Sequence, residues 1–373
     1  MTAYAHSTVW YDDVMASFWS SLFGKKQHSV LGIDIGLSSI KVVELKSQNN
    51  SIVLGTYGEL SLAPYGKGDV GQSQNIAPSQ IAKSLKDLLR EAKVTISKAG
   101  ISIPFSKSML SLVTLPNLPP AEMQTMIPLE ARKYIPVPIE EVQLDWFVLP
   151  GGKQASDKAQ VLLVAVQKDA LTSLDAAVQE AGVTPSFYEI EIFSTVRAVV
   201  DEPTKPVMVI DVGASTTNTY IVERGIVVAS HRMARGGQSA TMSLSASMNL
   251  PFAQAEDVKK KYGLLKDGIP TEYKRESVEL VYSSIFSESR RVLVSYETSA
   301  QKTVSAIILT GGGGVLKNVA PLAESIFSYP ISIADPFKKV SAPAFMVPVL
   351  KEIGAEFSVA LGLALRELEE LAR

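Results

Sequence analysis

Residues 29–46 read SVLGIDIGLSSIKVVELK, and residues 206–225 read PVMVIDVGASTTNTYIVERG. In each stretch an apolar, β-rich run ends in an Asp-x-Gly turn, and a second β-rich run follows. Asp34 with Gly36 and Asp211 with Gly213 therefore occupy equivalent places in two parts of the chain. A pattern that restarts in this way indicates an internal duplication.

An Asp-x-Gly turn at a strand end is suited to binding a phosphate group. Glycine has no Cβ, so a phosphate can approach the backbone N–H groups at Gly36 and Gly213. A carboxylate repels phosphate, and we therefore expect Asp34 and Asp211 to hold Mg²⁺ or its waters. For either copy alone, an ordinary turn-forming Asp is the alternative. The hydroxyl donors beside the two turns are Ser38, Ser39, Ser215, Thr216 and Thr217.

A third glycine turn lies downstream, in the sequence ILTGGGGVLKNVAPLAESI, between a strand-like run and a helical one. Consecutive glycines let backbone lie flat against a ligand, and beside two phosphate turns the expected ligand is an adenosine. A simple loop or helix cap is the alternative for some of these residues. The glycines are Gly311, Gly312, Gly313 and Gly314.

Length and composition bound the rest. A chain of 373 residues is expected to form two or more domains. A formal charge of −2 gives no electrostatic footprint for nucleic acid. The absence of cysteine excludes disulfides and thiolate metal sites and fits a reducing cytoplasm. No apolar run reaches the roughly 20 residues of a spanning helix, and no secretory signal opens the chain, so we expect it to stay on one side of the membrane.

Apolar spacing and helix-breaking residues predict the organisation of the chain. Helices are expected over residues 79–92, 169–182 and 356–373, and a β, β, α, β, β order between the two repeats suggests an inserted module. The predicted units are an amphipathic extension at 1–28, a first lobe at 29–100 that continues at 190–205, an inserted partner-binding subdomain at 101–189, a second lobe at 206–250 that continues at 305–373, and a helical subdomain of that lobe at 251–304.

These motifs resemble those of the actin, Hsp70 and sugar-kinase ATPases. GIDIGLSSIK and IDVGASTTN are similar to the two phosphate loops, ILTGGGG to the adenosine motif, and VALGLALR to the last connecting helix. The resemblance implies an actin-like α/β fold, a duplicated ribonuclease H-like unit in two lobes with a small α+β insertion, that binds ATP and Mg²⁺ between the lobes. It places Lys41 on the β and γ phosphates, although a snorkelling lysine is the alternative. It places Glu256 and Lys259, in AEDVKKKYG, at the ribose and adenine.

Residues 101–149, which contain the segment YIPVPIEEV, resemble the inserted subdomain of the PilM family of type IV pilus assembly proteins, and the resemblance runs from about Ser29 to the C-terminus. It implies a cytoplasmic, ATP-binding scaffold at the inner face of the bacterial inner membrane. Such a scaffold docks the N-terminal peptide of a PilN-like membrane protein in a groove beside the insertion, a physically reasonable mode of peptide binding. A homo-oligomer stays open.

Catalysis is the least determined part of the interpretation. Glu191, with Glu189 as a substitute, sits where related ATPases carry the residue that positions the attacking water, and Asp211 is the second catalytic candidate. A glutamate at a helix N-terminus is stabilising without any catalytic role. At most a slow ATPase is expected.

Three rival functions were weighed. An FtsA-like division protein would need a C-terminal amphipathic membrane helix, for which LALRELEELAR is too charged. A small-molecule kinase would need a second pocket with a general base. The cytoplasmic half of a type II secretion L protein would continue into a transmembrane segment.

The first residues lie outside these resemblances. Between Trp10 and Phe23 the apolar residues fall in pairs on a four-residue beat, which predicts an amphipathic helix. Contact with the membrane surface, docking on a protein surface and a disordered leader are the three alternatives. Asp12 and Asp13 weigh against anionic lipid. The pairs are Trp10/Tyr11, Val14/Met15, Phe18/Trp19 and Leu22/Phe23.

Overall fold

The computed structural model describes residues 28–48, 51–149, 158–201 and 204–372. Its first lobe is built on a five-stranded sheet with the order β3-β2-β1-β4-β8. The β1–β2 and β2–β3 pairs are antiparallel, whereas β4 lies parallel to both β1 and β8. The strands are β1 (Ser29–Ile35), β2 (Ser39–Gln48), β3 (Ser51–Ser61), β4 (Lys98–Ile103) and β8 (Thr184–Ile190).

The second lobe repeats this sheet. Its order is β11-β10-β9-β12-β13, so the position of each strand in chain order and in the sheet corresponds to one in the first lobe. The antiparallel and parallel pairs also correspond. The predicted duplication is therefore confirmed. The strands are β9 (Val207–Val212), β10 (Thr217–Glu223), β11 (Ile226–Met233), β12 (Ile307–Thr310) and β13 (Ile331–Ile333).

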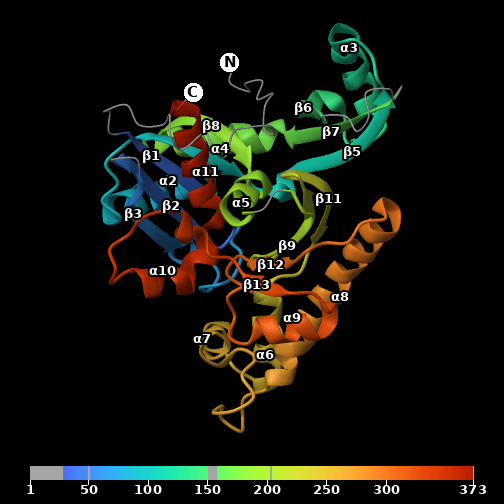
Figure 1. Cartoon of the computed structure of the whole chain (residues 1–373). Helices are drawn as coiled ribbons and strands as arrows, with labels where there is room; N and C mark the ends of the chain where they lie inside the picture. The colour runs from blue at the N-terminus through green and yellow to red at the C-terminus, as the bar shows by residue number, and fades with distance from the viewer. Residues whose placement is uncertain (1–27, 49–50, 150–157, 202–203, 373) are drawn as a thin grey trace.

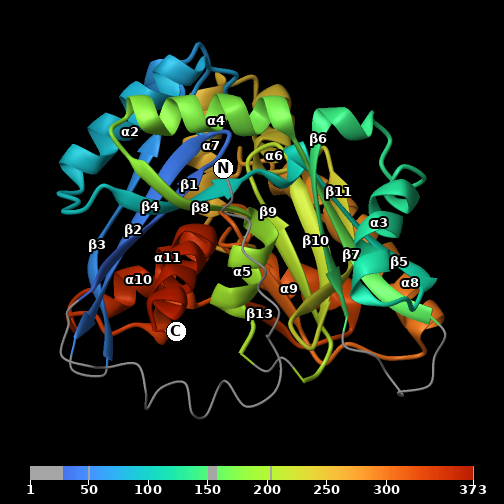
Figure 2. The same ribbon diagram turned by 90° about the horizontal axis from the view of Figure 1, so that it is seen from above.

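Two helices lie between the lobes, α5 (Glu191–Val199) and α11 (Ser358–Leu371), and they pack on each other (Figure 2). Helix α11 returns from the end of the chain to cover β1, β2 and β4. It comes so close that a Cβ at Gly32 would overlap the backbone oxygen of Ala360. The predicted assignment of 305–373 to the second lobe is therefore wrong for α11, because the apolar face of this helix is buried against the first sheet.

The outer helices cover the other faces of the sheets. Helices α2 and α4 pack on each other over the first sheet and share a hydrophobic cluster with β1 and β2. Helices α6, α7, α8 and α9 gather on the second lobe (Figure 1). Helix α6 packs on α7 and α8, so the helical subdomain begins before residue 251, where we had predicted its start. The bounds are α2 (Pro78–Glu91), α4 (Lys168–Glu180), α6 (Gly237–Met248), α7 (Phe252–Tyr262), α8 (Arg275–Ala300), α9 (Val319–Phe327) and α10 (Val347–Ile353).

A three-stranded antiparallel sheet with the order β5-β7-β6 forms the insertion. Figure 1 shows it projecting from the first lobe with α3 at its far end. The predicted range of 101–189 is too wide, because β4, α4 and β8 belong to the first sheet or its cover. The predicted extension covers residues 1–28. Residues 1–27, which include its amphipathic segment, lie outside the described residues. The bounds are β5 (Ser108–Pro116), α3 (Pro120–Ala131), β6 (Val142–Val148) and β7 (Lys158–Gln167).

Candidate functional site

The two Asp-x-Gly turns have the same hydrogen-bonding pattern. The N–H of Gly36 donates to the carbonyl oxygen of Ser39 at 3.1 Å, and the N–H of Gly213 donates to that of Thr216 at 2.9 Å. Each turn connects a central strand of its sheet to the next antiparallel strand. The duplication thus extends from sheet order to the backbone of the two predicted phosphate turns.

Asp34 lies near the end of β1, directly opposite Lys41 on β2. The Oγ of Ser102, on the neighbouring strand β4, donates to its Oδ1 at 2.9 Å and accepts the N–H of Ile35 at 3.0 Å. Burial raises the pKa of Asp34, and the charge of Lys41 opposes that shift. The carboxylate is held in place by the residues that the sheet register places beside it.

Asp211 occupies the equivalent position on β9, opposite Asn218 on β10 and beside Thr310 on β12. Burial and then the charge of Asp34 raise the pKa of Asp211 to about 7, against the opposing charge of Lys41. The structure therefore brings the two predicted metal ligands within electrostatic reach of each other, although they lie in different lobes. A divalent cation would relieve their repulsion.

The donor set fits Mg²⁺ bound with a nucleotide better than a metal held by protein alone. Among residues 28–48, 51–149, 158–201 and 204–372, no three His, Cys, Asp or Glu side chains form a metal cluster. Mg²⁺ keeps several waters and usually takes one or two carboxylates together with phosphate oxygens. Asp34 and Asp211 match that requirement.

Lys41 is largely buried, with 13% of its side chain exposed, and it is paired. Its Nζ lies 3.0 Å from Glu59 Oε1 and donates to Ser39 Oγ at 2.7 Å. Burial lowers the pKa of Lys41, but the charges of Glu59, Asp34 and Glu356 outweigh that effect and raise it. The lysine is thus a fixed cation beside the first phosphate turn. A snorkelling side chain, the alternative weighed from the sequence, would have carried its charge to solvent.

Glu191 begins α5 and faces the same space. Its Oε1 accepts the N–H of Phe105 at 2.9 Å and the Nδ2 of Asn218 at 3.0 Å. Burial, followed by the charges of Asp211 and Asp34, raises its pKa to about 8. The side chain therefore lies close to both aspartates and, at neutral pH in the protein alone, favours the protonated form.

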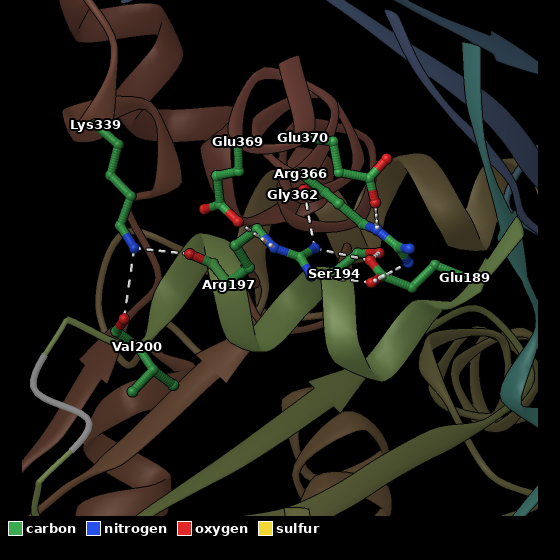
Figure 3. Close-up of polar contacts among 9 residues, drawn as sticks. All are labelled: Glu189, Ser194, Arg197, Val200, Lys339, Gly362, Arg366, Glu369 and Glu370. Carbon is green, nitrogen blue, oxygen red and sulfur yellow. Dashed lines mark hydrogen bonds and ion pairs between the residues drawn. The ribbon is translucent and has the colours of Figure 1, made fainter. Parts of the chain in front are cut away.

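Glu189, the predicted substitute, is part of a different structure (Figure 3). Its carboxylate accepts bonds from Arg197 at 2.7 and 2.9 Å and from Arg366 at 2.9 Å, and Ser194 donates to it as well. Burial opposes ionisation, but the two arginines prevail and hold its pKa at about 2. Glu189 is thus committed to a buried ion network that joins β8, α5 and α11, and it is not available to position a water.

Glu256 and Lys259 form a buried ion pair on α7 at 2.7 Å. The Nζ of Lys259 also donates to Thr241 Oγ1 at 2.8 Å and to the carbonyl oxygen of Gly237 at 3.1 Å. The N–H of Gly237 donates to the oxygen of Gly213 at 2.9 Å. The pair is therefore connected through one backbone step to the second phosphate turn.

The four glycines after β12 are not equivalent. Gly311 has a φ of +77°, and a Cβ there would overlap a carboxylate oxygen of Asp211. The N–H of Gly313 donates to Val212 at 2.8 Å, and that of Gly314 to Gly311 at 2.9 Å. At Gly312, in contrast, a Cβ would meet nothing closer than 3.8 Å, at Glu356. Gly311 and Gly313 keep the turn against β9, whereas the exposed Gly312 leaves room for a methyl group, which would make an ordinary contact with Glu356.

Several residues of this site were not predicted. Ser102, Asn218, Glu59 and Glu356 join it through strand register or through contacts between distant segments, and no motif marked them. No prediction concerned the loop before α2. It reaches the second lobe, where the N–H of Ser73 donates to Gln238 Oε1 at 2.9 Å. The RGG sequence before α6 was the one available signal for Gly237.

The family model described as type IV pilus assembly protein PilM matches residues 32–368. The chain belongs to this family. It is also similar to a solved structure titled PilM-PilN type IV pilus biogenesis complex, with 27% identity and a TM-score of 0.78 over 91% of this chain and 98% of that one. The predicted family and actin-like fold are therefore confirmed.

More distant relatives share the fold. MreB5 of Spiroplasma citri bound to ADP is 14% identical, with a TM-score of 0.51 over 92% of this PilM-family chain and 98% of that one. The cell division protein FtsA of Helicobacter pylori strain J99 is 25% identical over 229 residues, 54% of this chain and 46% of the relative. The chain thus spans about half the length of this curated relative. In the described part of the chain, no helix has the length and apolar character required to cross a bilayer.

Proposed function

We propose that this chain binds ATP with Mg²⁺ between its lobes and serves as a nucleotide-dependent scaffold in type IV pilus assembly. The observation that carries the proposal is the position of Asp34 and Asp211 at equivalent strand ends in the two lobes, close enough that burial and then the charge of Asp34 raise the pKa of Asp211. Membership of the PilM family and the ADP named for the related MreB5 support it. Mg²⁺ would neutralise the negative charge that these carboxylates and the phosphates bring together.

Different residues of the site would contact different parts of the bound nucleotide. Asp34 and Asp211 hold the cation. The N–H groups of Gly36 and Gly213 already bond within their own turns, so the donors to phosphate oxygens are the hydroxyls and the other backbone N–H groups of the two turns, at Ser38, Ser39, Ser215 and Thr216. Lys41 supplies a positive charge, for which phosphate competes with Glu59. Gly312 offers the open backbone for an adenosine, and Glu256 with Lys259 flanks the second turn.

Hydrolysis by this site is slow at most. Glu191 is the only predicted water-positioning residue that faces the aspartates within the described part of the chain. In the protein alone, burial and then the charges of Asp211 and Asp34 raise the pKa of Glu191 to about 8, and a carboxylic acid must first lose its own proton before it can accept one from water. We therefore expect slow turnover, in keeping with a nucleotide-dependent scaffold.

The partner that we propose is the cytoplasmic N-terminal peptide of a PilN-like membrane protein, bound at the insertion. The solved complex of related proteins supports this pairing. The three-stranded sheet and α3 form a hydrophobic cluster of their own and still expose Leu129 and Tyr134. Such exposed apolar side chains suit the docking of an extended peptide. The chain would then lie in the cytoplasm and reach the inner membrane through its partner.

Calorimetric titration of the full chain with ATP tests the nucleotide site. We expect binding with Mg²⁺ and at least about tenfold weaker binding in EDTA. Equal affinity for ATP with Mg²⁺ and in EDTA would contradict the role that we assign to the aspartates.

Co-purification with a tagged peptide from the start of the PilN-like protein tests the partner site. Leu129→Glu with Tyr134→Glu should abolish recovery and preserve Mg²⁺-ATP binding. The exposed Leu280, on α8, gives the matched control Leu280→Glu. Equal recovery by all variants would place the partner elsewhere.

A further inference from the structure

Residues 342–350 read APAFMVPVL, nine uncharged and mostly apolar residues that the proposed function does not use. Most of them are exposed: Phe345 by 81%, Val347 by 52% and Val349 by 48%. We call these three side chains the α10 apolar face. Val347 and Val349 point to different sides of the helix, so the name denotes the apolar surface around the start of α10 and not one side of it. A soluble protein rarely leaves several large apolar side chains this exposed within five residues unless something covers them.

This face is held firmly at both ends. Before it, Ser341 forms a parallel bridge with β3, donating to Ile52 at 2.7 Å and accepting from Leu54 at 2.9 Å. After it, Leu350 is buried in the main hydrophobic cluster. Figures 1 and 2 both show α10 beside β3 at the edge of the first sheet. A surface fixed in this way is a preformed docking site.

The chain enters the first sheet close to this face. Ser29 lies opposite Lys46 on β2, Lys46 lies opposite Val53 on β3, and Val53 bridges to Ser341. Three strand spacings separate Ser29 from Ser341, about 14 Å. The five residues 24–28 can span up to about 17 Å when extended. The amphipathic segment that ends at Phe23 can therefore reach the α10 apolar face.

We propose that the segment from Trp10 to Phe23 of this same chain docks on the α10 apolar face as an amphipathic helix. Its paired apolar residues provide one continuous apolar stripe, about 21 Å long in a 14-residue helix. Within the part of the chain that the structure describes, nothing covers the exposed side chains of the α10 apolar face, and the connecting length fits. The inference concerns neither the nucleotide nor the pilus partner and stands independently of the proposed function.

Charge favours this occupant over a lipid surface. Asp12 and Asp13 lie on the polar side of the segment, where anionic headgroups would repel them. Lys351 follows the face, is exposed, and has no carboxylate partner in the part of the chain that the structure describes. Lys351 is the cation that the face offers to these aspartates, and it stands beside the exposed Glu352.

Tryptophan fluorescence tests the docking directly. The chain has three tryptophans, so Trp146→Phe leaves only Trp10 and Trp19, both in the segment. In this background we expect the emission of a buried indole, and a shift to longer wavelength when Phe345→Ser and Val347→Ser are added. Leu280→Ser, at a side chain that is 71% exposed on α8, is the matched control and should cause no shift. Unchanged melting temperatures would show that the variants fold.

Disulfide cross-linking gives a second measurement, because the chain has no cysteine of its own. Met15→Cys with Ala344→Cys should form an intramolecular disulfide at every protein concentration, whereas Met15→Cys with Ser287→Cys on α8 should not. Three results would overturn the proposal: solvent-exposed emission that the face variants do not alter, a cross-link only between two chains, or burial of the tryptophans only when anionic vesicles are added.

Discussion

The two lobes share a backbone but direct different side chains at the space between them. Seven residues after each aspartate, the antiparallel partner is Lys41 in the first lobe and Asn218 in the second. Lys41 supplies a positive charge near both aspartates, whereas Asn218 donates to Glu191. Duplication thus preserved the turns, and the chemistry diverged at the positions opposite them.

The next strand along shows a second divergence. Ser102 on β4 and Thr310 on β12 lie beside Asp34 and Asp211, respectively. After Thr310 the chain makes the glycine turn, while after Ser102 it leaves for the insertion through Pro104 and Phe105. The same position in the two lobes therefore leads to the proposed adenosine loop in one and to the proposed partner module in the other. The N–H of Phe105 and the Nδ2 of Asn218 both donate to Glu191, so the start of the insertion and the second lobe meet at one carboxylate.

Asp34 and Asp211 are the residues that the two lobes still share at the site. Losing either aspartate should have the largest effect on nucleotide binding. Asp34→Ala or Asp211→Ala removes one ligand of the cation, and we expect a loss of at least about 100-fold in Mg²⁺-ATP affinity, roughly 3 kcal/mol. Calorimetry measures it, with Asp257→Ala, an exposed carboxylate of α7, as the control. If one of the two variants kept its Mg²⁺-ATP affinity, the two aspartates would not contribute equally to the cation site.

The next largest effect is expected for the ion network of Glu189, which joins the two helices between the lobes. Glu189→Gln leaves Arg197 and Arg366 without a buried counter-charge, and we expect a loss of about 3 kcal/mol in the free energy of unfolding at neutral pH. Urea denaturation measures it. Glu180→Gln, an exposed change on α4, should cost almost nothing.

The pH dependence gives a further check on this network. The folded-state pKa of Glu189 is about 2, below its ordinary value of 4.5. Its contribution is therefore present above pH 4.5 and is lost as the pH falls from 4.5 toward 2. The gap between the wild-type chain and Glu189→Gln should narrow in that window. A constant gap would mean that the ion network does not carry the stability.

The sequence predicted the regular elements well because their apolar periods are strong. The helix expected at 79–92 is α2 at Pro78–Glu91, and the helix expected at 169–182 is α4 at Lys168–Glu180. The two Asp-x-Gly turns were found because both chemistry and repetition marked them. Local pattern was sufficient wherever the structure depends on neighbours in sequence.

Features that depend on long-range pairing could not be predicted in this way. A buried strand such as β4 reads the same whichever sheet it joins, so the boundary of the insertion was misplaced. Glu189 and Glu191 are two residues apart and similar in sequence context, but only the fold separates the arginine network from the site. The packing of α11 on the first sheet could not be predicted either, because the apolar stripe of a helix does not indicate which surface the helix will cover.

The residues opposite the aspartates test the divergence of the lobes. Lys41→Ala removes a buried charge beside the first turn, and we expect Mg²⁺-ATP affinity to fall about tenfold, or 1.4 kcal/mol. Asn218→Ala should change that affinity much less, because it removes a neutral contact to Glu191. Lys46→Ala, on the same strand and more exposed, is the control. Equal losses at Lys41 and Asn218 would show that the two positions still do the same work.

The smallest expected effect is at Gly312, which corresponds in the second lobe to Pro104 at the start of the insertion. A methyl group there would lie 3.8 Å from a carboxylate oxygen of Glu356, an ordinary van der Waals contact, so Gly312→Ala should leave the melting temperature of the nucleotide-free chain unchanged. If an adenosine lies against this backbone, the methyl group separates the two surfaces, and affinity should fall by a few-fold, less than about 1 kcal/mol. Since ATP and ADP share the adenosine, both should weaken equally, whereas Lys41→Ala should affect ATP more than ADP. Calorimetry with both nucleotides on both variants distinguishes the two roles, and undiminished affinity for both in Gly312→Ala would place the adenosine away from this turn.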